Sequence, residues 1–170
     1  SGSANASSFT ISGAATTEIQ NVAAATSFDA SAATGNVIAT LTAAVTDKLA
    51  TIKTGEGDDS VTVAGNDITT RATISGDAGD DTLTIISGTD TIAPTMSGFE
   101  TITLSDPTAT GGFMLSMSAV TDVTDIKVSA GAMNGNATFI NMPSSDITLT
   151  TTGAVTGNTI SADTAGAVTV

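Results

Sequence analysis

Short segments in which apolar and polar residues alternate recur along the whole chain. A period of two residues is typical of a β-strand that buries one face. Small polar or glycine-containing breaks, such as Thr34-Gly35-Asn36, separate the segments. The pattern therefore predicts short strands over residues 9–11, 18–22, 37–41, 49–52, 60–63, 82–85, 112–117, 123–128, 137–142, 146–150 and 158–161.

Strands at this spacing with no clear helix predict an all-β fold, either a parallel β-solenoid or an antiparallel β-sandwich. Asn-Gly and Asp-Gly pairs, which favour tight hairpins, are missing from most junctions, and Asn134-Gly135 is the exception. We therefore favour parallel coils, in the form of a β-roll or right-handed β-helix. The alanine-rich segment 21–33 has helical propensity, but its Thr, Ser and Asp residues favour a strand or coil passage of a solenoid.

A glycine- and acid-rich phrase is repeated inside this pattern. It is clear at residues 54–62 and 76–84 and weaker at 88–92 and 98–102. Glycine permits tight turns that aim carbonyl oxygens inward, and a carboxylate at the end of the turn completes an all-oxygen shell. Calcium accepts such shells of Asp side chains and backbone carbonyls. Asp59 and Asp81, each at the end of a clear phrase, are the strongest candidate ligands.

The two clear phrases resemble the calcium-binding nonapeptide of RTX proteins, which winds a parallel β-roll. The segment 96–104 looks like one found in calcium-dependent surface-layer proteins of Gram-negative bacteria. Thr54 stands where the first glycine of one turn is expected and Asp77 where the second glycine of the other is expected. It remains open whether Asp90 and Glu100 are ligands or remnants of the repeat. The resemblance implies a calcium site drawn from Thr54, Glu56, Asp59, Gly76, Asp77, Ala78, Asp81 and Asp90.

Composition narrows both fold and function. The 170 residues include no Cys, His, Trp or Tyr, and only 3% are aromatic. Small and β-branched residues that stack on their equivalents suit a solenoid better than a core built on large aromatics. Without His or Cys, the chain has no Ser-His-acid or Cys-His nucleophile and no histidine-bound transition metal. We therefore expect no intrinsic enzyme activity, and assign Met114, Met117, Met133 and Met142 to packing rather than to a cofactor.

The chain is strongly acidic, with 17 acids against 4 bases and a net charge of −13. Such a surface repels nucleic acid and anionic lipid, and no stretch is apolar for long enough to span a membrane. Ten of the acids fall between residues 54 and 106, where cations would relieve their repulsion. The chain opens without Met at Ser1 and stops at Val170 within a strand pattern, so we expect a fragment of a longer polypeptide. The RTX resemblance implies a secreted protein, exported in one step by an uncleaved signal located beyond Val170.

The resulting expectation is a structural extracellular protein, a calcium-stabilised subunit of a bacterial surface layer that assembles with itself into a lattice. Cell-surface polysaccharide is a further expected partner. A calcium-stiffened adhesin or biofilm protein and an RTX scaffold of a secreted hydrolase remain alternatives. Three regions are expected: β-rich coils at 1–53, the calcium-binding β-roll segment at 54–106, and continuing solenoid coils at 107–170.

Overall fold

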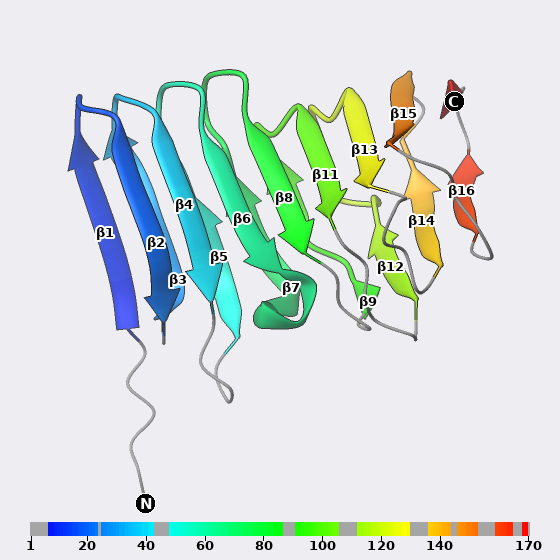
Figure 1. Ribbon diagram of the computed structural model, residues 1–170, viewed down its shortest axis with the longest axis horizontal. Helices are drawn as coiled ribbons and strands as arrows, with labels where there is room; N and C mark the ends of the chain where they lie inside the picture. The colour runs from blue at the N-terminus through cyan, green and yellow to red at the C-terminus, as the bar shows by residue number, and fades with distance from the viewer. Residues whose placement is uncertain are drawn as a thin grey trace, which may run out of the picture.

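A computed structural model gives the fold, and it describes residues 7–23, 25–42, 48–86, 91–105, 112–129, 136–143, 146–152, 159–164 and 168–169. The chain forms an all-β solenoid of stacked parallel sheets (Figure 1). Every strand pairing in the described ranges is parallel, which excludes the antiparallel sandwich. A single 3₁₀ turn, Gly65–Asp67, interrupts the strands, and no helix in the described part could cross a membrane.

Three parallel sheets form the walls. The first contains β1 (Ser7–Gly13), β3 (Ala25–Ala33), β5 (Leu49–Lys53), β7 (Ile68–Ser75) and β10 (Thr95–Ser97), in that order. The third contains β9 (Thr91–Ile92), β12 (Phe113–Ser116), β14 (Ala137–Met142) and β16 (Ile160–Thr164). The second runs the length of the solenoid (Figure 1) and contains β2 (Thr17–Ala23), β4 (Val37–Thr42), β6 (Ser60–Ala64), β8 (Thr82–Ile86), β11 (Thr101–Ser105), β13 (Asp125–Ser129), β15 (Ile147–Thr152) and β17 (Val168–Thr169).

The core is a set of columns in which one aliphatic residue stacks on the next coil. In the second sheet, Val61 pairs with Leu83, Leu83 with Ile102, and Ile102 with Ile126, and all four are buried. Burying one such side chain stabilises the fold by about 1.5–3 kcal/mol. Repeated from coil to coil, these contributions stabilise the solenoid without large aromatic residues. The alternation read from the sequence at residues 60–63 and 82–85 matches the burial patterns of β6 and β8. β11 alternates in the same way, although no strand was predicted there.

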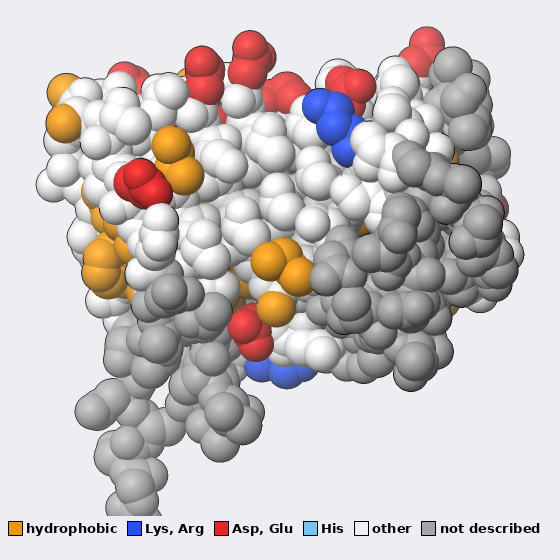
Figure 2. Space-filling view, viewed as in Figure 1, with side chains coloured by type: hydrophobic (Ala, Val, Ile, Leu, Met, Phe, Trp, Pro, Cys, Tyr) orange, Lys and Arg blue, Asp and Glu red, His pale blue; other side chains and the backbone are white. Residues whose placement is uncertain are grey.

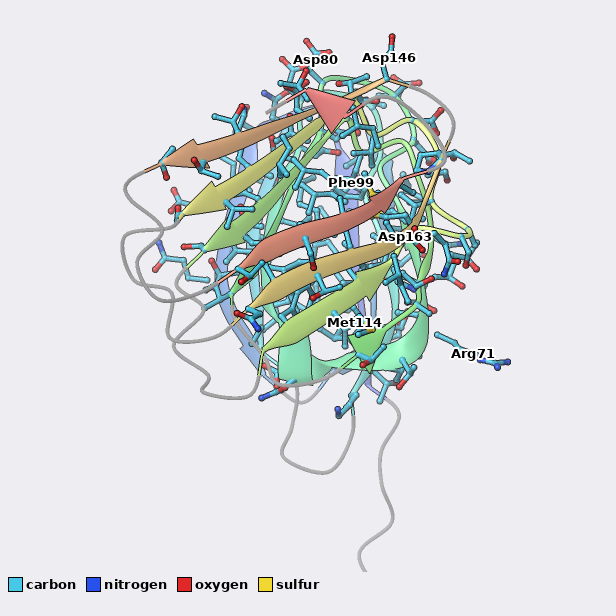
Figure 3. The ribbon with its side chains drawn as sticks, turned by 90° about the vertical axis from the view of Figure 1, so that its right-hand side faces the viewer. Arg71, Asp80, Phe99, Met114, Asp146 and Asp163 are labelled. Carbon is cyan, nitrogen blue, oxygen red and sulfur yellow. The ribbon has the colours of Figure 1, made fainter. Side chains whose placement is uncertain are left out.

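Aromatic rings occupy only a few places inside. Phe28, Phe99 and Phe139 are fully buried, and Figure 3 shows Phe99 inside the cross-section. Met117 and Met142 are buried and Met114 is half-buried, which is consistent with packing; Met133 lies outside the described residues.

One sequence expectation about the first sheet is confirmed, and one of its strands was not predicted. The alanine-rich segment is extended, because β3 pairs in parallel with both β1 and β5, as the preference for a strand passage predicted. No strand was expected at β7, where Arg71 and three Thr residues obscure the apolar positions Ile68, Ala72 and Ile74. A shift of pairing register between β5 and β7 breaks the simple alternation there.

Candidate functional site

The turns that lead into the second sheet stack along one edge of the solenoid, and they bring the acidic phrases together. Acidic side chains line the upper rim of the molecule in Figure 2. Figure 3 shows Asp80 and Asp146 projecting from this rim, while Arg71 projects on another side of the cross-section. We call the turn residues Asn36, Asp58, Asp59, Asp80, Asp81, Glu100 and Asp122 the acidic edge.

The two clear phrases occupy equivalent positions in successive coils. Glu56 forms a parallel bridge with Ala78, 22 residues later, and Ser60 pairs with Thr82 over the same interval. Glycine is required where the turns touch: a Cβ on Gly79, which has a φ of +143°, would collide with the carbonyl of Gly57. The repeat spacing therefore corresponds to one coil of the solenoid.

The buried acids of these turns accept hydrogen bonds from the backbone. Asp59 is 2% exposed, and its Oδ1 accepts from the N–H of Val37 at 2.6 Å while its Oδ2 accepts from Gly55 at 3.2 Å. The N–H of Asp59 in turn donates to Oδ1 of Asp81 at 2.8 Å. The N–H of Asp81 donates to Oε2 of Glu100 at 2.8 Å. These contacts form a ladder in which each turn's amide bonds the carboxylate of the next coil.

A second ladder lies outside the first and runs in the opposite sense. The N–H of Asp58 donates to Oδ1 of Asn36 at 3.2 Å, and the N–H of Asp80 donates to Oδ1 of Asp58 at 3.1 Å. Here each amide bonds a side chain of the preceding coil. Asp58 and Asp80 are exposed, so they act both as a solvated surface and as links between coils.

Glu100 substitutes for aspartate in a shorter turn. Gly98 follows directly on the β10 strand, and only Phe99 separates it from Glu100, whereas four residues separate Gly76 from Asp81. The longer glutamate side chain still reaches the amide of Asp81. Beyond it, Asp122 accepts from the N–H of Gly98 at 3.0 Å, and this bond, followed by one from Thr121, lowers the pKa of Asp122.

Asp81 differs from Asp59 in that its carboxylate is incompletely hydrogen-bonded. It is 1% exposed, and its Oδ2 has no hydrogen-bond partner among the described residues. Burial raises the pKa of Asp81 to about 7; the amide of Asp59 lowers it, and the charges of Asp59, Glu100 and Asp58 raise it. A buried carboxylate with an unpartnered oxygen is costly unless a proton or a cation neutralises it.

Asp59 and Asp81 differ in hydrogen bonding because their two turns carry different residues at one equivalent position. The second oxygen of Asp59 is bonded by Gly55, and the equivalent position in the next coil is Asp77. Asp77 has a φ of +62°, and its exposed carboxylate accepts from the Ser75 hydroxyl at 2.9 Å. Gly76 instead lies against the free oxygen of Asp81. In the turn that carries Asp77 in place of glycine, Asp81 thus lacks the amide donor that Gly55 supplies to Asp59.

The structure brings only some of the expected calcium ligands together in the buried part of the turns. Thr54, Asp59, Gly76 and Asp81 lie buried in adjacent turns, whereas Glu56, Asp77 and Ala78 are exposed, and Asp90 lies outside the described residues. Two of the expected carbonyls already accept bonds: Gly76 from the Thr54 hydroxyl at 3.1 Å and Ala78 from the N–H of Gly57 at 2.9 Å. The described ranges contain no group of three or more acidic side chains placed to hold a metal.

The two buried carboxylates differ in the oxygen that each leaves available to a hard cation. Asp59 is already satisfied by two amides, so the unpartnered Oδ2 of Asp81 is the oxygen best suited to a cation. Because no three acidic side chains of the described ranges are placed to hold one metal ion, a calcium ion would have to draw the rest of its shell from backbone carbonyls and water.

Asn36 and Asp122 were not identified from the sequence. Gly35-Asn36 precedes Gly57-Asp58 by 22 residues, so the repeat interval carried a signal for Asn36. Asp122 follows a longer interval of 24 residues from Gly98 and is not preceded by glycine, so no comparable signal marks it.

Comparison with protein families, with curated proteins and with solved structures yields no match to this chain. The functional argument therefore rests on the residues and on the geometry of the acidic edge.

Proposed function

We propose that this chain is a structural, extracellular solenoid, a calcium-stabilised subunit of a bacterial surface layer. The observation that carries the proposal is the buried, unpartnered Oδ2 of Asp81 within a ladder of stacked carboxylates. A divalent cation beside this oxygen would offset the desolvation of Asp81 and its repulsion from Asp59 and Glu100.

The proposed role of calcium is a folding switch. Where calcium is scarce, the carboxylates of the acidic edge repel one another and weaken the contacts between coils. Extracellular calcium sites typically bind at about 10⁻⁴ to 10⁻³ M, so millimolar calcium outside the cell is sufficient to fill such a site. Metal binding that occurs only in the folded state adds its free energy to folding.

Self-assembly is supported by strand edges that have no partner among the described residues. Within these residues, β1 and β2 are terminal strands of the first and second sheets, and each pairs on one side only. An unpaired strand edge is a template for a further strand. A second copy added end to end would extend the sheets, and calcium between acidic edges would link neighbouring copies side by side.

The test is the state of the purified chain in millimolar calcium and in chelator, followed by light scattering and electron microscopy. The proposal predicts ordered arrays in calcium and dispersed particles in chelator. Folded single particles in both conditions would contradict the lattice and favour the adhesin alternative. A histidine-bearing catalytic domain in the parent polypeptide would favour the hydrolase scaffold.

A further inference from the structure

The outward face of the second sheet carries a regular array of hydroxyl groups. Strands β6, β8 and β11 each contribute three outward residues spaced by buried ones, and these align across the strands without a register shift. The first two outward positions of each strand carry hydroxyl groups, whereas the third positions are Ala64, Ile86 and Ser105. Six residues make up this array, which we call the threonine face: Ser60, Thr62, Thr82, Thr84, Thr101 and Thr103. One column extends further, because Thr40 pairs with Thr62.

The array is uncharged, and its six residues are half-buried. None of its six hydroxyls forms a hydrogen bond to another group within the described part of the chain. Elsewhere such hydroxyls bond each other, as Ser161 does with Thr138 and Thr152 with Ser129. Figure 2 shows the centre of this face free of Asp, Glu, Lys and Arg side chains. Charged residues of the second sheet lie to either side of the array, at Glu18 on β2 and at Asp125 and Lys127 on β13.

The spacing of the array is set by the sheet. Neighbouring parallel strands lie about 4.8 Å apart, and alternate residues along a strand are about 6.6 Å apart. The threonine face is therefore a two-dimensional grid of hydroxyl and methyl groups with these two repeats. Oxygen positions on the surface planes of hexagonal ice repeat at distances of comparable size.

We propose that the threonine face binds an ordered water lattice, that of ice. The hydroxyl groups would take lattice positions, while the threonine methyl groups restrict the water around them. Because strands of one sheet are held by an unbroken ladder of backbone bonds, the grid is rigid before binding, which lowers the entropy cost. This inference goes beyond the structural role and does not depend on it.

Two other occupants fit less well. The threonine face spans roughly 14 Å by 10 Å, or about 140 Å², so a second copy docked on it alone falls far short of the about 800 Å² that a stable interface needs from each partner. A carbohydrate also fits poorly, because the six residues of the threonine face are all Ser or Thr. The face therefore lacks the aromatic, amide or charged groups that would fix a sugar ring.

The test uses the chain in calcium-containing buffer, with ice-crystal shaping and thermal hysteresis as readouts. The proposal predicts faceted crystals with the wild-type chain and loss of both effects with Thr84→Lys or Thr62→Lys, because a long charged side chain breaks the grid. The matched control is Thr73→Lys. Thr73 is exposed on β7 of the first sheet, where it belongs to a separate column with Thr51 and Thr95.

Circular dichroism checks that each variant is folded, and Thr62→Lys serves if Thr84→Lys does not fold. Unshaped ice with the folded wild-type chain would overturn the proposal, as would equal activity in Thr84→Lys and Thr73→Lys. Wild-type chain that leaves ice unshaped but is retained on a neutral polysaccharide column, or that dimerises through this face, would replace ice by that occupant.

Discussion

The backbone N–H of Asp59 donates to Oδ1 of Asp81 across one full coil, at 2.8 Å. This bond joins the turns formed by the two clear acidic phrases of the sequence, so the two turns stabilise each other. Together with the bonds from Val37 to Asp59 and from Asp81 to Glu100, it links four successive turns. The acids of this edge therefore have a structural role even before any cation is considered.

Replacing Asp59 by Ala is expected to destabilise the fold. The change leaves the amides of Val37 and Gly55 without their buried acceptor, at a cost of about 3 kcal/mol. Urea unfolding in calcium measures this loss. Asp163→Ala is the matched control, because Asp163 is exposed on β16, and it should change stability by less than about 0.5 kcal/mol. Equal losses in the two variants would show that the ladder contributes nothing.

Stability in chelator should fall as the pH rises from about 4 to about 7. Burial raises the pKa of Asp81 to about 7 in the folded chain, well above the ordinary aspartate pKa of 3.8. The folded state therefore binds more protons in this interval, and raising the pH favours unfolding. Urea midpoints measured across the interval test this prediction.

Asp81→Asn should flatten that pH dependence, because the amide retains an acceptor for the N–H of Asp59 and cannot ionise. Calcium should flatten it in the wild-type chain, because a bound cation favours the ionised carboxylate. A wild-type midpoint that rises over this pH range would contradict the assigned environment of Asp81.

Gly76→Ala should be more damaging than Gly13→Ala. A Cβ at position 76 would overlap the carbonyl of Gly98 and approach Oδ2 of Asp81 at 2.5 Å, so adjacent coils would have to separate. At Gly13, which has a φ of +118°, the space is open and only backbone strain opposes alanine. Thermal unfolding of both variants compares the two costs. A smaller loss for Gly76→Ala would mean that the coils are less closely packed at this edge.

Glu100→Asp should break one rung of the ladder while preserving charge. The turn that carries Glu100 is shorter than those before it, so an aspartate side chain would not reach the amide of Asp81. A loss of about 1–3 kcal/mol is expected from an unsatisfied buried amide. Glu18→Asp provides the control, since Glu18 is exposed on β2. Unchanged stability in Glu100→Asp would show that the amide finds another acceptor.

Much of the solenoid was predictable, because alternation reports directly on which residues of a strand are buried. Val61 and Val63 in β6, and Leu83 and Ile85 in β8, illustrate this. The separation of parallel coils from a sandwich rested on missing hairpin signals and was confirmed by the parallel pairing. β7 escaped prediction because a change of register within it disturbs the period of two.

The acidic edge was predictable as a set of stacked turns, but the chemistry of its members was not. The repeat interval placed Asp59 and Asp81 together, yet whether a carboxylate meets an amide or a cation depends on where each N–H points. Asp77, which stands where the preceding coil has glycine, changes the available amide donors in one turn. A shortened turn brings Glu100 into the ladder. Such local differences are not visible in a repeat pattern.

The most direct test of the account is thermal unfolding followed by circular dichroism, with millimolar calcium and then with chelator, for the wild-type chain and Asp81→Asn. The account predicts a midpoint that calcium raises markedly in the wild-type chain and raises less in the variant. Equal midpoints for the wild-type chain in calcium and in chelator would contradict the proposed switch. The acidic ladder would then be a purely internal set of hydrogen bonds.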